Sequence, residues 1–153
     1  MAAKVSDLLN GGIRYGKDLK TNGTTIEPGL LVKLDTGGST VSTAGSAAAN
    51  KPFGVAYGGR YKPYRPTTRV FATDEPLTVV FGTGLFLLSS DFFAGGTLPT
   101  AGDKLYSAQS GLWSTNAAGV QVGDCVGTRI RSEAVGGTGA NQNLSLVRFN
   151  IQP

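Results

Sequence analysis

The stretch "PGLLVKLDTGGSTVSTAG" (28–45) decides the fold, because two runs of apolar and β-branched residues flank a pair of glycines. Runs of this kind that are separated by a short Gly-rich turn are typical of a β-hairpin. We therefore expect one strand over 29–35 and its return over 39–43. The turn between them begins at Asp35, a residue type that favours turns.

A second stretch, "AGDKLYSAQSGLWSTNAAG" (101–119), repeats the first in outline. Gly29 matches Gly102 and Gly54 matches Gly127, at a spacing of 73 residues in both cases, with one residue of slip inside the hairpin. Short motifs rich in Gly, Ser and Thr also match by chance, so both duplication and coincidence stay open. A duplication predicts two similar hairpin modules that close one sandwich or barrel.

Further short strands, bounded by Gly and Pro turns, are expected along the rest of the chain. They lie at 53–59, 68–73, 77–82, 84–90, 103–108, 111–115, 124–131 and 144–151. No window shows a strong helical period, apart from a single turn that Ser6 and Asp7 are placed to cap. The sequence therefore predicts an all-β fold: a single-domain β-sandwich or barrel of short strands over 26–153, with an extended N-terminal arm over 1–25.

The composition agrees with one ordinary domain. The chain has 153 residues, of which 23 are Gly, and only 16% are charged. The net charge of +4 reflects scarce acids rather than abundant Lys and Arg, which is a weak signal for nucleic-acid binding. No apolar stretch reaches the length of a membrane span, and residues 1–12 lack the hydrophobic region of a secretory signal. We expect a soluble protein that is made in the cytoplasm.

The chain contains no histidine, which removes the commonest general base and the usual nucleophilic triads and zinc sites. Most of the acidic residues lie at expected turns, where Asp and Glu are explained by turn preferences and need no catalytic role. These acids are Asp35, Asp74, Glu75, Asp103 and Asp124. We therefore expect no enzyme, no cofactor and no small-molecule substrate, and a hidden carboxylate pair is the only route left to hydrolysis.

Two further residues are expected inside the domain. Cys125 is the single cysteine, so it forms no disulfide within the chain, and its strand-like context favours a small buried hydrophobe over a reactive thiol. Trp113 lies in the alternating run "GLWST" (111–115), which favours a core position over an exposed platform for sugars.

The basic stretch "RYKPYRPTTR" (60–69) is the clearest candidate for a binding segment. Its cations and aromatic rings suit a protein interface, which we favour; a solvated loop and a strip for nucleic acid are the alternatives. The candidate interface residues of this stretch are Arg60, Tyr61, Lys62, Tyr64, Arg65 and Arg69. Those of the N-terminal arm are Lys4, Arg14, Lys17 and Lys20.

The succession of five segments resembles the small β-rich head decoration, or cement, proteins of tailed bacteriophages. The segments are "EPGLLVKLD" (27–35), "FGVAYG" (53–58), "AGDKLYSAQSGLWST" (101–115), "VGDCVGTRIR" (122–131) and "LSLVRFNI" (144–151). The resemblance spans residues 26 to 151. The basic insertion at 60–66 corresponds to no motif of that family.

The resemblance implies a virion structural protein on the outer face of the capsid, commonly a homotrimer, that bridges neighbouring capsomers through the major capsid protein. It also implies an N-terminal arm that reaches adjacent subunits. The alternatives are a tail or fibre domain with a carbohydrate-binding role and a nucleic-acid-binding β-barrel. Neither a membrane nor a small molecule is expected as a partner.

Overall fold

The computed structural model describes residues 6–15, 19–22, 26–57, 71, 76–132 and 141–152. Strands dominate these residues, which confirms the all-β fold class. The strands are β1 (Ser6–Tyr15), β2 (Lys20–Thr21), β3 (Leu31–Leu34), β4 (Thr40–Thr43), β5 (Gly54–Tyr57), β6 (Thr78–Leu88), β7 (Lys104–Ser107), β8 (Trp113–Ser114), β9 (Gln121–Ser132) and β10 (Asn141–Ile151). Short 3-10 turns occur at Ala48–Asn50, Ser90–Phe92, Ala94–Gly96 and Gln109–Gly111.

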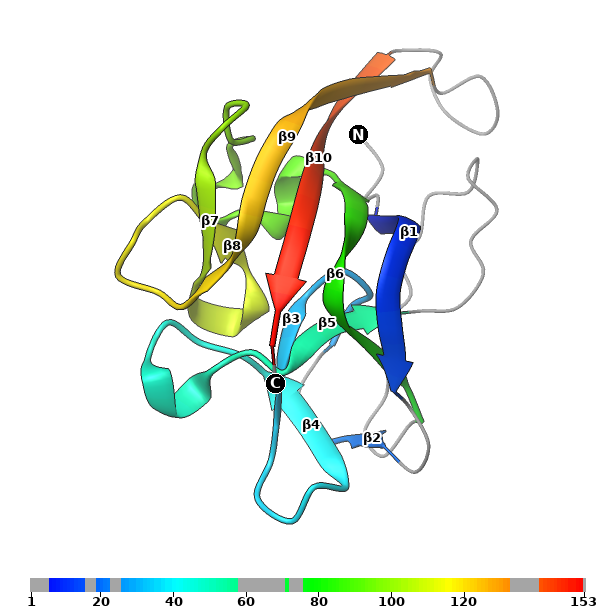
Figure 1. Cartoon of the computed structure of the whole chain (residues 1–153), viewed down its shortest axis with the longest axis vertical. Coiled ribbons are helices and arrows are strands. Elements are labelled where there is room, and N and C mark those ends of the chain that lie inside the picture. Colours follow the sequence, from blue (N-terminus) through cyan, green and yellow to red (C-terminus); the bar gives the residue numbers. More distant parts are fainter. Residues whose placement is uncertain are drawn as a thin grey trace.

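All ten described strands belong to one sheet, in the order β2-β4-β3-β5-β6-β10-β9-β7-β8, with β1 on the other edge of β6 (Figure 1). The first residues of β6, up to Val80, pair with β5, and the stretch from Gly82 onward pairs with β10. Gly82 has a φ of +81°, a left-handed conformation that glycine adopts without strain. The change of partner along one edge of β6 therefore coincides with an irregularity in its backbone.

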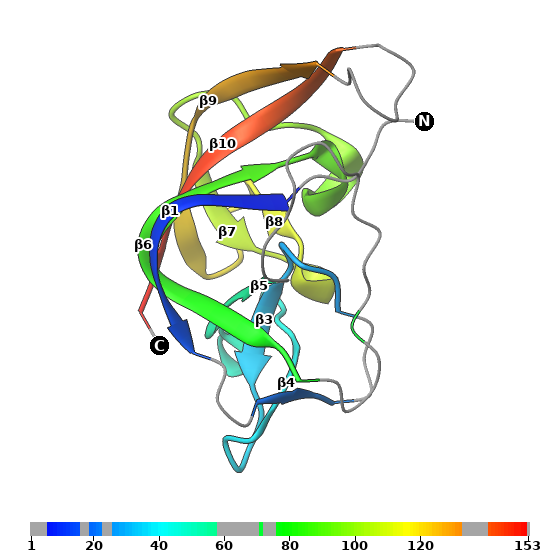
Figure 2. The ribbon, with the colours of Figure 1, turned by 90° about the vertical axis from the view of Figure 1, so that its right-hand side faces the viewer.

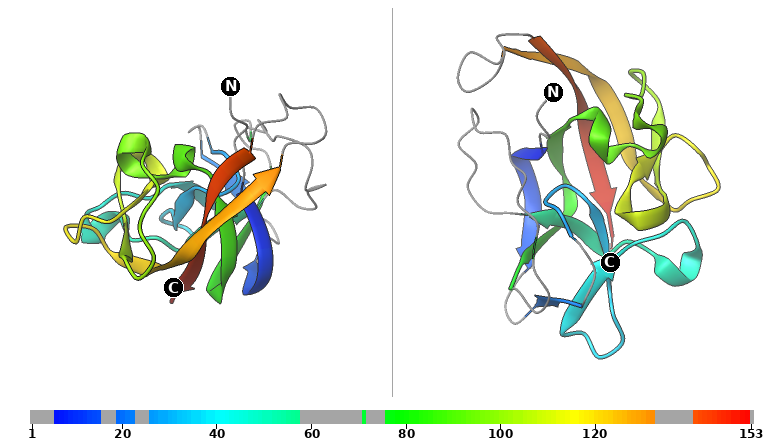
Figure 3. Two further views of the ribbon diagram at one scale, coloured as in Figure 1. Left: turned by 90° about the horizontal axis from the view of Figure 1, so that it is seen from above. Right: turned by 180° about the vertical axis from the view of Figure 1, so that it is seen from behind.

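The sheet curves around a main core to which both of its halves contribute (Figure 2). Leu31 and Val55 enter this core from one half, and Leu105 and Val122 enter it from the other. Phe86 of β6 packs on Phe149 of β10 with ring centroids 5.5 Å apart. Seen from above, β9, β10, β6 and β1 lie side by side as a curved wall (Figure 3).

A second cluster of buried residues packs on the opposite face of the β4-β3-β5 part of the sheet. It consists of Leu19, Ile26, Val32, Val41, Ala56, Phe71, Leu77 and Val79, with Phe53 packed against it at its margin. Strands β3 and β5 are thus buried on both faces, which explains why "LLV" (30–32) and "GVA" (54–56) are continuously apolar.

The two hairpins that resemble each other in sequence occupy equivalent places in the sheet. The β3-β4 hairpin is followed by β5, which pairs with β3, and the β7-β8 hairpin is followed by β9, which pairs with β7. The Gly29 amide donates to the Ala56 carbonyl at 2.8 Å, and the Gly102 amide donates to the Cys125 carbonyl at the same distance. The sequence match therefore corresponds to a repeated arrangement of strands.

The match of Gly54 with Gly127 is wrong. Gly54 pairs with Val32 and Gly123 pairs with Leu105, so the strand register makes Gly123 the counterpart of Gly54, in place of Gly127. Both glycines lie directly against a carbonyl oxygen of the next strand. The structure requires glycine at both positions because a Cβ atom has no room there.

The N-terminal segment also differs from expectation. The expected helical turn at Ser6–Leu9 is wrong, because residues 6–15 form β1 and pair along β6. The Ser6 hydroxyl caps no helix; it donates to the Pro28 carbonyl at 2.7 Å. The segment is extended, yet it belongs to the sheet, so the boundary placed after residue 25 does not separate β1 from the domain.

The expected break between strands at Gly84 is wrong as well, since β6 continues through this residue. A Cβ atom at Gly84 would stand 2.5 Å from the Asn10 carbonyl oxygen and 2.6 Å from the Phe149 ring. Glycine is needed there because β1 and an aromatic ring approach β6 closely, which local sequence patterns do not reveal.

Candidate functional site

Of the ten candidate interface residues, Arg14 and Lys20 lie among the described residues. The others lie outside them, and these are Lys4, Lys17, Arg60, Tyr61, Lys62, Tyr64, Arg65 and Arg69. The interpretation of "RYKPYRPTTR" (60–69) as an interface segment therefore stays a prediction.

Arg14 and Lys20 both pair with residues 76–80, the segment in which β6 begins. Arg14 pairs with Val80 across the sheet, and Lys20 forms a bridge with Pro76. The Arg14 guanidinium lies over the Tyr57 ring, with 4.9 Å between its central carbon and the ring centroid. This cation–π contact orients the arginine side chain without neutralising its charge.

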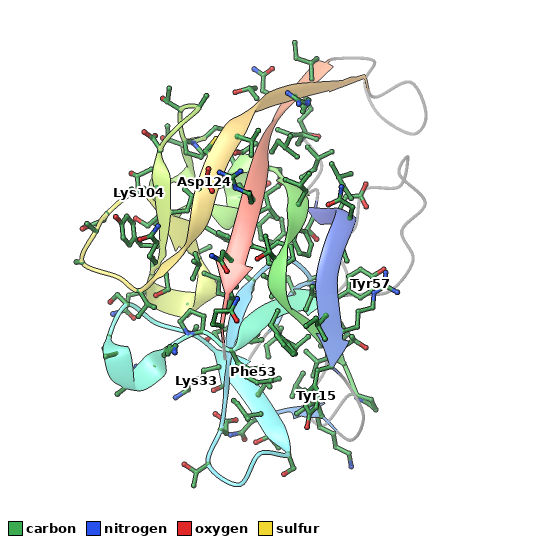
Figure 4. All side chains as sticks on the ribbon, in the orientation of Figure 1. Tyr15, Lys33, Phe53, Tyr57, Lys104 and Asp124 are labelled. Carbon is green, nitrogen blue, oxygen red and sulfur yellow. The ribbon has the colours of Figure 1, made fainter. Side chains whose placement is uncertain are left out.

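A row of aromatic and aliphatic side chains on the other face of β1 from Arg14 was not identified from the sequence. The Tyr15 and Phe53 rings pack edge to face at 5.8 Å, and the Phe53 and Phe81 rings are tilted at 5.7 Å. Ile13 pairs directly with Phe81 across β1 and β6. We call Ile13, Tyr15, Phe53 and Phe81 the β1 patch, and Figure 4 labels Tyr15 and Phe53 at the end of β1.

The β1 patch is the exposed margin of the second cluster. Val79, which is fully buried in that cluster, pairs with Tyr15, and Phe53 packs against the same cluster. Ile13 is 58% exposed and Tyr15 is 45% exposed, while both Phe rings are half-buried. Apolar area of this kind on the surface of a small domain often marks an interaction site.

A local signal for this patch exists in "IRY" (13–15), where apolar, charged and aromatic residues alternate as in a strand with one exposed face. Nothing local indicates that Phe53 and Phe81 lie beside it. Their proximity arises from the pairing of β1 with β6 and of β5 with β6.

Trp113 and Cys125, which the sequence places inside the domain, are both buried. Trp113 is fully buried, and its indole Nε1 donates to the Gly29 carbonyl at 2.9 Å. This confirms the core assignment and removes Trp113 as a platform for sugars. Cys125 is buried as well, with its sulfur 3.3 Å from the Ser145 hydroxyl oxygen.

The acids for which the structure gives contacts have structural roles. Asp35 accepts hydrogen bonds from Asn22, Thr40 and Ser42, which holds the β3-β4 turn, and Asp103 accepts one from the Thr100 amide. These contacts confirm the turn assignments of both residues. Asp74 and Glu75 lie outside the described residues.

The turn assignment of Asp124 is wrong, because this residue lies within β9 and pairs with Arg148 of β10. The Arg148 guanidinium donates two hydrogen bonds to the Asp124 carboxylate, at 3.0 and 2.8 Å. Hydrogen bonding first, and Coulomb attraction second, raise the pKa of Arg148 above its ordinary value. Because arginine is ionised at any physiological pH, this exposed pair acts as a constant cross-strand link.

Within the described residues, no group of three or more His, Cys, Asp and Glu side chains is arranged to hold a metal ion. The helices of this same part of the chain are all too short to cross a membrane.

Comparison with known proteins found no protein-family model that matches the chain, and no curated protein that matches it.

Proposed function

We propose that this chain is a virion structural protein that binds the outer face of a tailed-phage capsid and stabilises it by bridging neighbouring capsomers. The proposal rests on the resemblance of five segments between residues 26 and 151 to head decoration proteins. It is supported by an all-β domain whose surface presents an apolar and aromatic patch at β1.

The observation that carries the proposal is the β1 patch. Its four side chains are contiguous, and two of them are about half exposed. Arg14, between Ile13 and Tyr15 in sequence, lies on the opposite face of β1, over the Tyr57 ring. A protein interface of this kind gains free energy from apolar area at its centre and specificity from charges at its rim. Binding of this type needs no pocket and no catalytic group.

The proposed assembly is a homotrimer. Each contact with a shell can be weak, because three linked sites convert the later binding events into intramolecular ones and raise avidity by about 10²–10⁴. Sedimentation equilibrium of the purified chain tests this part directly. A trimer has three times the 15.8 kDa mass of the chain, and a monomeric protein at capsid-binding concentrations would contradict it.

The experiment that tests the function is co-sedimentation with shells assembled without this chain, both DNA-filled and emptied, alongside free DNA, at 50 and 200 mM salt. We expect saturable binding to both kinds of shell and none to free DNA. Binding to DNA alone, with a loss of roughly two orders of magnitude in affinity between the two salt concentrations, would support the nucleic-acid-binding alternative instead.

The number of copies on each particle separates the proposal from the tail or fibre alternative. A decoration protein is present in stoichiometric amounts across the shell, whereas a tail or fibre domain is present in few copies. Retention by a glycan array, together with a low copy number, would favour the carbohydrate-binding role.

A further inference from the structure

We infer that Asn10 and Gly11 form a self-modification site, at which the folded protein slowly converts Asn10 into aspartate and isoaspartate without an enzyme. The two residues lie in the middle of β1. An asparagine that precedes a glycine meets the least steric hindrance in this reaction, because glycine has no Cβ atom to shield its nitrogen. The site is independent of the proposed function, since it involves only this chain and water.

The chemistry needs only the groups at the site and water. The Gly11 backbone nitrogen loses its proton and attacks Cγ, the carbonyl carbon of the Asn10 side chain. A Cγ–N bond forms, the Cγ–Nδ2 bond breaks and ammonia departs, which leaves a five-membered imide. Water then opens the imide at either of its two carbonyls. One product is aspartate, and the other is isoaspartate, whose backbone runs through Cβ and Cγ of the former side chain.

The backbone around the site is irregular and lies at an edge. The pairing of β1 with β6 shifts register between Leu8 and Asn10, and again between Gly11 and Ile13, so the site stands between two bulges. Among the described strands, β1 pairs with β6 alone, and it lies at the margin of the curved wall (Figure 1). A short paired stretch at such an edge opens at low free-energy cost, and opening lets Asn10 rotate toward the Gly11 nitrogen.

The Asn10 side chain is exposed, so water has access to the imide. Its amide makes no hydrogen bond to any of the residues that the structure describes, so no contact with them has to break before the attack. Gly11 has a φ of +75°, a left-handed conformation that suits glycine at this position. The fold therefore maintains, on an exposed edge, the residue pair that favours the reaction most.

Asn22 provides a comparison within the same chain, because it also precedes a glycine in the sequence. Its side-chain nitrogen donates to the Asp35 carboxylate at 3.1 Å, and its backbone N–H donates to the Val41 carbonyl at 2.9 Å. Both hydrogen bonds oppose the rotation that the attack requires. The structure thus separates two sites that the sequence makes alike.

The isoaspartate product should loosen β1. A Cβ atom at Gly84 would stand 2.5 Å from the Asn10 carbonyl oxygen, and one at Gly11 would stand 2.6 Å from the Thr83 carbonyl oxygen. Strands β1 and β6 are therefore in close contact on both sides of the modified bond. Isoaspartate adds one carbon atom to the backbone there, which shifts the following residues of β1 along β6 and disturbs their pairing.

The experiment ages the full-length protein at neutral and at mildly alkaline pH. Trypsin then releases the peptides 5–14 and 21–33, which contain Asn10 and Asn22 as their only asparagines. Mass spectrometry follows the small mass gain that marks conversion of an amide into an acid, and an isoaspartyl methyltransferase identifies isoaspartate. The same measurement in urea gives the rate of each site in the unfolded chain.

We expect Asn10 to convert at least about tenfold faster than Asn22 in the folded protein, and both to convert at similar rates in urea. The rates should rise with pH, because the glycine nitrogen must lose its proton. Asn10→Gln is the control: its longer side chain forms the imide far more slowly, so peptide 5–14 should stay unchanged. Conversion of Asn22 as fast as Asn10 in the folded protein, or of neither site, would overturn the inference.

A second variant isolates the effect of the lengthened backbone. Asn10→Asp carries the new charge on an ordinary backbone, so it is the matched control for the aged protein. Amide hydrogen exchange over β1 should be faster in the aged protein than in this variant. Equal exchange in the two would show that isoaspartate at this position does not loosen β1.

Discussion

The indole Nε1 of Trp113 donates a hydrogen bond to the Gly29 carbonyl, 2.9 Å away and 84 residues earlier in the chain. Gly29 has a φ of +103°, and a Cβ atom there would stand 2.6 Å from the Ser6 Cβ atom. The contact therefore joins three parts of the fold, because Trp113 begins β8, Gly29 precedes β3, and Ser6 begins β1.

Replacing Trp113 with Ala should lower the free energy of unfolding by about 3–5 kcal/mol, because it leaves a large cavity in the main core. Urea denaturation followed by circular dichroism measures the loss. Trp113→Phe is the matched control, since it retains most of the volume and removes the donor to Gly29, and it should cost less. An Ala variant as stable as the unmodified protein would contradict the core role.

The strand register predicts different effects for three glycines. Gly54→Ala and Gly123→Ala should each destabilise the protein by about 1–3 kcal/mol, because the new Cβ atom meets a carbonyl oxygen of the neighbouring strand. Gly127→Ala is the control, with its nearest side-chain atom 3.8 Å away, and should change stability by less than about 1 kcal/mol. Equal effects at Gly123 and Gly127 would mean that the register of β9 is different.

Removal of residues 2–15, which deletes β1, should destabilise the domain by at least about 2 kcal/mol. The deletion breaks the ladder between β1 and β6, in which each hydrogen bond contributes about 0.5–1.5 kcal/mol, and exposes a new sheet edge. Thermal unfolding and light scattering record the loss of stability and any aggregation. Removal of residues 2–5, which leaves β1 whole, is the control, and identical melting of both truncations would show that β1 contributes nothing.

The Cys125 thiol should react with an aromatic disulfide reagent only when the protein unfolds. The side chain is 1% exposed and its sulfur contacts the Ser145 hydroxyl, so the reagent has no access in the folded state. The reaction rate in increasing urea should follow the unfolding transition measured by circular dichroism. Rapid modification without denaturant would place Cys125 at the surface and contradict the packing of β9 on β10.

Local sequence patterns were sufficient to predict the two hairpins. Strands β3 and β4 lie within 29–35 and 39–43, and the Asp35 turn between them forms as expected, because alternation of side chains and turn chemistry are properties of neighbouring residues. The burial of Trp113 followed from the same reasoning. Composition was a sufficient guide to the all-β class, since the chain is rich in turn glycines and shows almost no helical period.

The N-terminal strand was not predicted because its conformation depends on a distant partner. The stretch "SDLLNGG" (6–12) contains a possible helix cap and a terminating glycine pair, so a short helical turn was the local solution. In the structure, backbone hydrogen bonds to β6 replace it. The same dependence explains the error at Gly84. Its local sequence predicts a break between strands, but in the structure the Phe149 ring packs directly against it.

The sequence by itself determined that both hairpins extend, where the first hairpin turns and that Trp113 and Cys125 are buried, because these follow from neighbouring side chains and backbone preferences. Only the tertiary structure decided that β6 pairs with β1, β5 and β10, and hence that Ile13, Tyr15, Phe53 and Phe81 meet in one patch. Strand pairing over long distances is set by how the whole core packs, and that information is not contained in any single stretch of the chain.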